Sequence, residues 1–308
     1  MTTAPTSIDL SRIPFPDALL ELGFETLKAG FIARYLEAWA QLRQDNPDLP
    51  QYDVQSIESD PLVVAGARAW SWLRLHERGR FNDNVKAVFA TMSTDADLEN
   101  VAASQGLFRL TVTPAIGDTP AVMETDQALL RRYLLSFDKP SIGSIGRYLL
   151  DAWTVWPGMG HARINGRAIH GRRGDSDVVI TGPGGRDPTA VELALVTAAV
   201  RHEDVLPEAL GVAVLAATRR EYATDQVIEV PAIGPDAEVV RQEAIARIRA
   251  AGDARTVIGG EVPAGLMAGA AYGQNVIRVR DLSPVVIEAD PYTVPVLTGI
   301  NVAVEVRP

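Results

Sequence analysis

Residues 80–135 read RFNDNVKAVFATMSTDADLENVAASQGLFRLTVTPAIGDTPAVMETDQALLRRYLL, and this stretch joins two parts of the chain whose patterns differ. It opens in a helical segment, and Asp95–Ala103 predicts a second, shorter helix. Arg109–Thr113 is a β-prone run, and Pro114 stops it because proline has no amide hydrogen to give to a sheet. A turn-forming passage follows, and Asp126 is predicted to cap the helix that comes next. We therefore expect a helical part before this stretch and a mixed part after it.

The part before this stretch has the periodicity of helices. Between Phe24 and Arg43 apolar residues recur every three or four positions, which places them on one face of a helix. This aromatic stripe consists of Phe24, Leu27, Phe31, Tyr35, Trp39 and Leu42. Two interpretations fit the aromatic stripe: it packs on a core of its own chain, or it packs on a neighbouring subunit.

A second long helix is predicted from Leu62 to about Met92, after a first-turn proline at Pro61. Its large apolar side chains, Trp70, Trp72 and Leu73, are predicted to lie in the core. Its polar residues Arg74 and His76 are predicted to face solvent. Residues 1–16 are rich in threonine and proline, and they are predicted to form an extended arm.

The part after this stretch alternates short strands with short helices. Strands are predicted at residues 161–169, 177–181, 212–218, 226–230, 257–258, 276–279, 285–289 and 300–306, and helices at 126–137, 144–153, 187–200, 236–250 and 263–272. A long, regular β-α-β repeat is missing, so we predict an α+β protein with an N-terminal helical region followed by small mixed α/β domains. The predicted domains are an arm and helical domain (1–107), a central α/β domain (108–205) and a C-terminal α/β domain (206–308).

Composition excludes several classes of function. The net charge of −10 argues against binding to nucleic acid, which requires basic surface, and against docking on an anionic membrane. No cysteine is present, so disulfides, cysteine-ligated zinc and thiol catalysis are excluded. The N-terminus lacks the basic and apolar regions of a signal peptide, and the longest nearly apolar run, 210–217, is much shorter than a membrane helix.

A search for reactive constellations finds none. The four histidines, His76, His161, His170 and His202, form no HExxH motif, and His161 and His170 lie nine positions apart, on opposite faces of one predicted strand. We therefore predict no catalytic residues, no cofactor-binding residues and no metal ligands. Asp and Glu are plentiful, so spacing alone leaves a carboxylate pair for hydrolysis open.

Three further patterns have simple structural interpretations. Asp95, Asp97 and Glu99 imitate the start of a calcium loop, but the twelfth position is Gly106, so we interpret the aspartates as helix-start residues. Gly182–Arg186 is glycine-rich without the pattern of a phosphate loop, and we predict a surface turn. The one basic cluster is predicted to form a solvated hairpin, with an acidic partner surface as the alternative; it contains Arg163, Arg167, Arg172 and Arg173.

The pieces of the central stretch together resemble the baseplate J-like proteins of contractile-tailed bacteriophages. That family shows an asparagine in a helix, a D-x-D/N-L-D helix start, an R-L-T-I-T-P strand, and E-S-D before a helix that carries an arginine. The matching residues here are Asn82, Asp95–Leu98, Arg109–Pro114, Glu124–Asp126 and Arg131. The resemblance extends over roughly residues 8–288, and it rests on the order and separations of the pieces.

The chain departs from the family pattern at three places, one of which is the less typical Gly273–Asn275 segment. Leu206-Pro207 stands where the family usually has R-P, so this chain lacks that arginine and any contact it makes. Ser93 and Thr94 stand where a glycine is frequent.

The resemblance implies a structural, non-enzymatic protein of the baseplate wedge. Such proteins link wedges into a ring around the central hub and spike, and couple baseplate change to sheath contraction. Implied partners are the protein itself, as a homodimer or in ring contacts, and other wedge proteins, with hub, spike and sheath-proximal proteins as further candidates. Neither a cofactor nor membrane insertion is implied. The protein would be made in the host cytoplasm and incorporated into a phage tail, a tailocin or another injection device.

Two alternatives remain open at this point. A tail-associated hydrolase predicts a cleft with convergent carboxylates or a histidine pair of perturbed pKa. An assembly chaperone predicts a protein that is absent from the mature particle.

Overall fold

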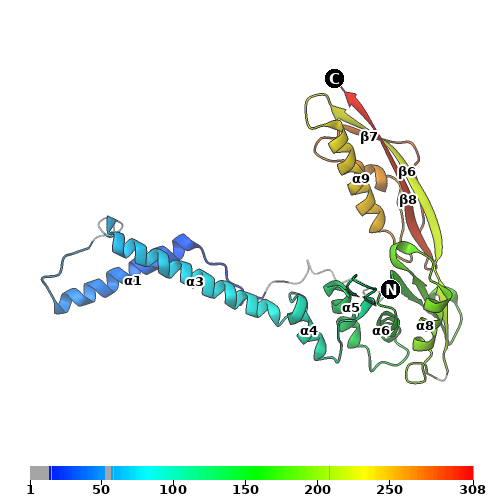
Figure 1. The fold of residues 1–308 in the computed structure, drawn as a ribbon, viewed down its shortest axis with the longest axis horizontal. Coiled ribbons are helices and arrows are strands. Elements are labelled where there is room, and N and C mark those ends of the chain that lie inside the picture. Colours follow the sequence, from blue (N-terminus) through cyan, green and yellow to red (C-terminus); the bar gives the residue numbers. More distant parts are fainter. Residues whose placement is uncertain (1–13, 15, 53–56, 58, 208, 308) are drawn as a thin grey trace. The chain divides into compact units, whose positions relative to one another are not determined.

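The computed structural model describes residues 14, 16–52, 57, 59–207 and 209–307, and Figure 1 labels its helices and strands. The chain divides after Gly106 into two compact units. Among the described residues, the N-terminal unit is helical, whereas the C-terminal unit, from Leu107 onward, combines helices with three small sheets. The predicted class, α+β with an N-terminal helical region, is therefore confirmed. The predicted division into three domains stays a prediction, and the arm predicted at 1–16 lies mostly outside the described residues.

In the N-terminal unit, helices α1 (Phe24–Asp45) and α3 (Pro61–Ala87) lie side by side as a hairpin, and α4 (Asp95–Ala103) follows (Figure 1). Asp60 caps α3 by accepting hydrogen bonds from the backbone of Leu62 and Val63. The buried core between α1 and α3 is small and consists of Ile32, Ile57, Val63 and Ala67.

The aromatic stripe of α1 packs within this unit. Phe31 contacts Trp70 of α3, with ring centroids 5.6 Å apart. Trp39 contacts Tyr52 at 5.0 Å and donates a hydrogen bond from Nε1 to the carbonyl of Pro50. The aromatic side chains are nevertheless only half-buried. The structure thus supports the first interpretation of the aromatic stripe, packing on its own chain.

The prediction that Trp70, Trp72 and Leu73 lie in a core is wrong. Their exposed fractions are 38 %, 61 % and 53 %. The reason is geometric: α3 has α1 as its main helical neighbour, so one partner helix covers one face of a 27-residue helix and leaves the others open. Arg74 and His76 are exposed, as predicted.

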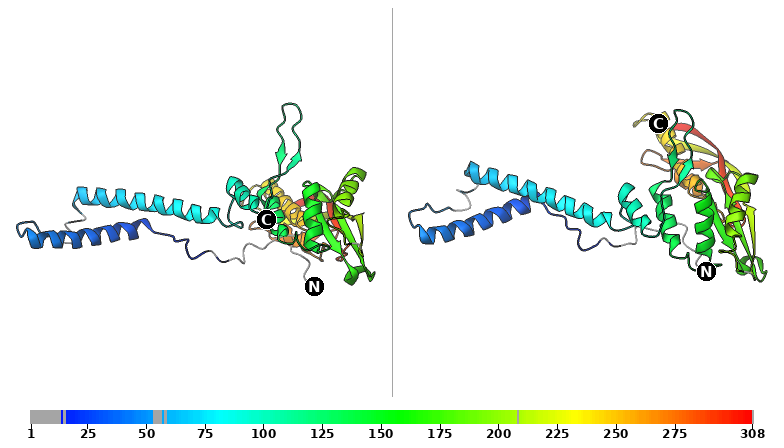
Figure 2. Two further views of the ribbon diagram at one scale, coloured as in Figure 1. Left: turned by 90° about the horizontal axis from the view of Figure 1, so that it is seen from below. Right: turned by 60° about the horizontal axis from the view of Figure 1, so that its bottom comes forward.

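The C-terminal unit opens with a small hairpin of β1 (Thr111–Thr113) and β2 (Val122–Met123), shown in Figure 2, followed by α5 (Asp126–Ser136) and α6 (Ile145–Val155). The strand β2 was not predicted, because two residues are too few to show an alternation. The prediction that Asp126 caps α5 is wrong by one residue, since the Thr125 hydroxyl accepts from the amide of Ala128.

The first larger sheet has the order β3-β4-β5, with β3 (His161–Asn165) antiparallel to β4 (Asp175–Thr181) and β5 (Gly211–Ala216) parallel to β4. A one-turn helix, α7 (Arg167–His170), ends the strand that was predicted to reach residue 169. A short 3-10 turn, η2 (Pro183–Gly185), precedes α8 (Ala190–Val200). This helix begins later than predicted, because Thr189 and Glu192 form a capping box. Side chains from α6, α8 and this sheet form the largest buried cluster.

The second larger sheet has the order β7-β6-β8, with β6 (Thr218–Pro231) at its centre, β7 (Arg278–Asp281) antiparallel to it and β8 (Thr293–Arg307) parallel to it. Helices α9 (Ala237–Asp253) and α10 (Leu266–Ala271) pack against this sheet.

Several strand predictions in this region are wrong. β6 and β8 begin well before the predicted residues 226 and 300, because charged residues such as Arg219, Arg220 and Glu221 hide the alternation in β6. Residues 257–258 form no strand, and 285–289 contribute one isolated bridge between Ile287 and Val262.

Candidate functional site

Three residues that carry the family resemblance, Arg109, Glu124 and Asp126, come together with a fourth residue in the C-terminal unit as a polar cluster. Arg109 donates from Nη1 to the carbonyl of Glu124 and from Nη2 to Oδ1 of Asp126, both at 2.6 Å. Glu124 Oε2 accepts from Arg132 Nη1 at 2.7 Å and from the amide of Leu110 at 3.2 Å. The polar cluster, formed by Arg109, Glu124, Asp126 and Arg132, therefore ties the β1–β2 hairpin to α5.

One ion pair of the polar cluster, between Arg132 and Glu124, is almost completely buried. The side chains of Arg132 and Glu124 are 3 % and 1 % exposed. Arg132 Nη1 also donates to the carbonyl of Phe108 at 3.2 Å. A buried charge is tolerated when it is paired and hydrogen-bonded in this way, so this pair holds local structure rather than presenting a reactive group.

Sequence reasoning chose Arg131 and missed Arg132. Arg131 lies over the ring of Trp153, with its guanidinium carbon 4.5 Å from the centroid, and burial lowers the pKa of its guanidinium. Arg132 stands three residues after the buried Leu129 and three before the buried Leu135, on the inner face of α5. That spacing was the signal that distinguishes the two arginines.

The other residues of the resemblance serve the N-terminal unit. Asn82 donates from Nδ2 to the carbonyl of Leu20 at 2.9 Å, which attaches the segment before α1 to α3. Asp95 and Asp97 lie in the first turn of α4, as interpreted from the sequence, where carboxylates suit the positive end of the helix dipole. Within the described ranges, no group of three His, Asp or Glu side chains is placed to hold a metal ion.

His161 and His170 each have structural contacts with the backbone. His161 Nδ1 accepts a hydrogen bond from the amide of Ile258, 97 residues later in the chain. Burial, reinforced by Arg131 and Arg163, lowers the pKa of His161 to about 4, so its imidazole is neutral at pH 7. His170 lies on α7 and not on the predicted strand, and its Nδ1 accepts from the amide of Arg172.

The glycine-rich segment 182–186 is only partly the surface turn that was predicted. Pro183 and Gly184 are exposed, but Gly185 is buried against β8 with a φ of 75°. A Cβ on Gly185 would lie 2.7 Å from Cγ2 of Val296, so a larger residue would clash there. Arg186 pairs with Glu192 and lies over Trp156, which fixes the turn to α8 and α6.

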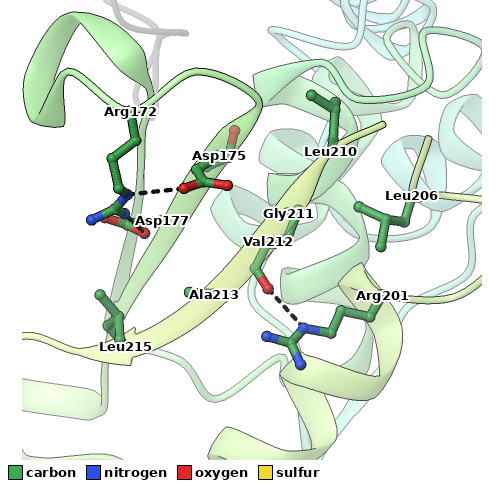
Figure 3. Close-up of a pocket in the computed structure, with 11 residues that line it drawn as sticks. Arg172, Asp175, Asp177, Arg201, Leu206, Leu210, Gly211, Val212, Ala213 and Leu215 are labelled. Atoms are coloured by element: carbon green, nitrogen blue, oxygen red, sulfur yellow. Dashed lines mark hydrogen bonds and ion pairs between the residues drawn. The ribbon is translucent and has the colours of Figure 1, made fainter. Parts of the chain in front are cut away.

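An open cavity of about 630 Å³ runs along β5, and Figure 3 shows its lining residues. Arg172 pairs with Asp175 at 3.1 Å and with Asp177 at 2.5 Å, and the hydroxyl of Tyr292 donates to Asp177 at 2.7 Å. Arg201 donates from Nε to the carbonyl of Val212 on β5. The two carboxylates that this cavity offers are thus engaged by protein partners, and Arg172 of the basic cluster is paired.

None of the described helices is long and apolar enough to cross a bilayer.

Two comparisons place the chain among known proteins. Residues 58–116, which include α3, α4 and β1, match the model of the Baseplate J-like N-terminal domain. The baseplate protein J of Escherichia phage P2 is 29 % identical over 293 residues, which cover 90 % of this chain and 90 % of that protein. The matched region contains Asn82, the start of α4 and the Arg109–Pro114 segment, where the sequence alone showed the resemblance. Both comparisons agree with the resemblance seen in the sequence, and the chain is similar to the baseplate J-like proteins.

Proposed function

We infer that this protein is a structural component of a phage tail baseplate and is incorporated into the virion. The observation that carries this inference is the similarity to baseplate protein J of Escherichia phage P2 along 90 % of both chains. The polar cluster agrees with it, because its charged side chains bind one another and hold the fold.

We further propose that the protein is part of the baseplate wedge. In this role it links wedges into a ring around the central hub and spike, and it couples baseplate change to sheath contraction. Its partners are other wedge proteins and further copies of itself. A tailocin or another phage-derived injection device would use the same contacts, so the proposal covers those particles as well.

The surface of α3 supports binding to other proteins. Large apolar side chains are exposed along the whole helix, which a monomer would not be expected to leave in water over such a length. The exposed fractions are 83 % for Leu62, 61 % for Trp72, 53 % for Leu73 and 49 % for Phe81. Since α1 already covers one face of α3, we assign the remaining surface to helices of neighbouring baseplate proteins.

The proposal is tested by co-expressing the protein with the tail proteins of its own particle. The mass of the purified species is then measured by light scattering. A complex of defined mass with at least one tail protein is expected. A monomer that binds none of them contradicts the wedge role and returns attention to the hydrolase alternative, which a screen on cell-wall polymers would then address.

A further inference from the structure

Strand β8 forms one edge of the second larger sheet (Figure 1), and the first half of this edge is protected by the chain itself. The amide of Thr218 bonds to the carbonyl of Tyr292, so alternate residues from Thr293 onward direct their backbone groups away from β6. The carbonyl of Thr293 accepts from the amide of Gly259, and the next outward residue, Pro295, has no amide hydrogen. The carbonyl of Leu297 accepts from Arg249. Further strand pairing is thereby blocked in this half.

The second half of the same edge has no such protection. Thr298 of β8 is an extra, bulged residue opposite the step from Tyr222 to Ala223 of β6, and it shifts the register by one residue. Beyond it, the amide of Ala232 bonds to the carbonyl of Arg307, so the odd-numbered residues now face β6. The amides and carbonyls of the even-numbered residues face outward, and in the described part of the chain none of them has a hydrogen-bond partner. We call these four residues, Ile300, Val302, Val304 and Val306, the open edge.

The side chains around the open edge make it self-complementary. If a second β8 pairs antiparallel about a twofold axis at Ala303, Ile300 lies opposite Val306 and Val302 opposite Val304. All four outward amides and all four outward carbonyls of each copy are then bonded. On the other face of the sheet Asn301 lies opposite Glu305, so no two like charges meet.

We propose that the open edge is a homodimer interface, in which β8 pairs with β8 of a second copy and the two three-stranded sheets become one six-stranded sheet. The charges beside it fit this arrangement, because Glu305 is already paired with Arg280 of the same chain and needs no counter-charge from the partner. The row of apolar side chains continues across the twofold axis, as in an isologous interface. The inference deepens the proposed role, since it names the surface through which two copies join.

The chain has no cysteine, so a single introduced cysteine can report pairing between two copies by forming a disulfide. In the proposed register Ala303 faces its own copy in a non-hydrogen-bonded pair, with Cα atoms about 4.5 Å apart, which a disulfide can span. Ala303→Cys should therefore form a covalent dimer under mild oxidation of the isolated full-length protein. The matched control is Ala223→Cys, an exposed alanine of the central strand β6, which should stay monomeric.

A second substitution distinguishes β8–β8 strand pairing from disulfides that form when two molecules collide at random. Val306→Pro removes an outward amide and no bond to β6, and the side chain of Val306 is 58 % exposed, so the fold should be kept. Combined with Ala303→Cys, it should reduce the disulfide-linked fraction at least tenfold, while circular dichroism shows an unchanged fold. Cross-linking at residue 303 no greater than at residue 223, or cross-linking that Val306→Pro leaves unchanged, would overturn the inference. Because no other tail protein is present, this result is independent of the wedge proposal.

Discussion

At the residue scale, the polar cluster shows what three residues of the resemblance, Arg109, Glu124 and Asp126, do physically. The side chains of Arg132 and Glu124 are almost completely buried, and each is bonded to the other and to a backbone group of the segment before β1, whereas Nε of Arg132 has no partner in the described part of the chain. The energetic value of such a pair appears when one member is removed, because the remaining charge is then buried alone. These residues therefore join the β1–β2 hairpin to α5.

The pair gives the first residue-scale prediction. Glu124→Ala should lower the free energy of unfolding of the C-terminal unit by about 3–5 kcal/mol, because Arg132 would stay buried without its partner. Asp126→Ala is the comparison, since its pair with Arg109 is more exposed, at 33 % for the aspartate, and should cost about 1 kcal/mol. Denaturant unfolding of both variants measures the difference, and equal losses would argue against a buried pair.

The second residue-scale prediction concerns pH and His161. Its folded-state pKa of about 4 lies below the ordinary value of 6.5, so between these values the unfolded chain binds a proton that the folded chain does not. Stability that is present above pH 6.5 is therefore lost as the pH falls toward 4, by about 1–3 kcal/mol from this residue. His161→Asn keeps an acceptor for the amide of Ile258 and removes the titration. Melting temperatures between pH 7 and pH 4.5 should fall less for this variant than for the unsubstituted protein; parallel curves would exclude the mechanism.

Residue contacts were only partly predictable. The sequence indicated Glu124 and Asp126 as members of a signature, but the choice of Arg131 over Arg132 depended on which face of α5 is buried. The sequence analysis predicted Asp126 as the N-cap of α5, whereas Thr125 is the cap. Both residue types are good caps and the two are adjacent, so sequence alone does not distinguish them. Tertiary packing decides such cases.

At the element scale, the helices and strands with a clear apolar periodicity were predicted well, and those without it were not. Helices α1 and α9 begin within a residue of their predicted positions, because their apolar spacing and start signals agree. Strand β6 was largely missed, because its buried face includes Tyr222, Thr224 and Gln226, which read as polar positions. The exposure of α3 was also missed, since tryptophan and leucine at helical spacing look the same whether they meet their own core or a partner.

The exposed surface of α3 gives the element-scale prediction. Trp72→Glu combined with Leu73→Glu should change the melting temperature by less than about 3 °C, because both side chains are exposed. Binding to the neighbouring tail protein should weaken at least tenfold. Ala67→Glu, at a buried position of the same helix, is the control and should unfold the N-terminal unit. Full binding by the double variant would show that this surface is not the interface.

At the scale of the whole molecule, the central stretch was correctly recognised as the joint between a helical and a mixed part, because the change in periodicity is visible in sequence. The structure divides the chain after Gly106. We propose that the C-terminal unit divides again near residue 205, which limited proteolysis would test. The open edge of β8 could not be predicted from sequence, because it depends on a bulge at Thr298 of β8 and on which backbone groups remain unpaired.

The central claim is that this protein remains in the particle as a structural part of the baseplate. The most direct measurement is its copy number in purified particles by quantitative mass spectrometry, with its position found by labelling. We expect several copies per particle, all at the distal end of the tail. Complete particles that lack the protein would contradict the account and identify it as an assembly chaperone.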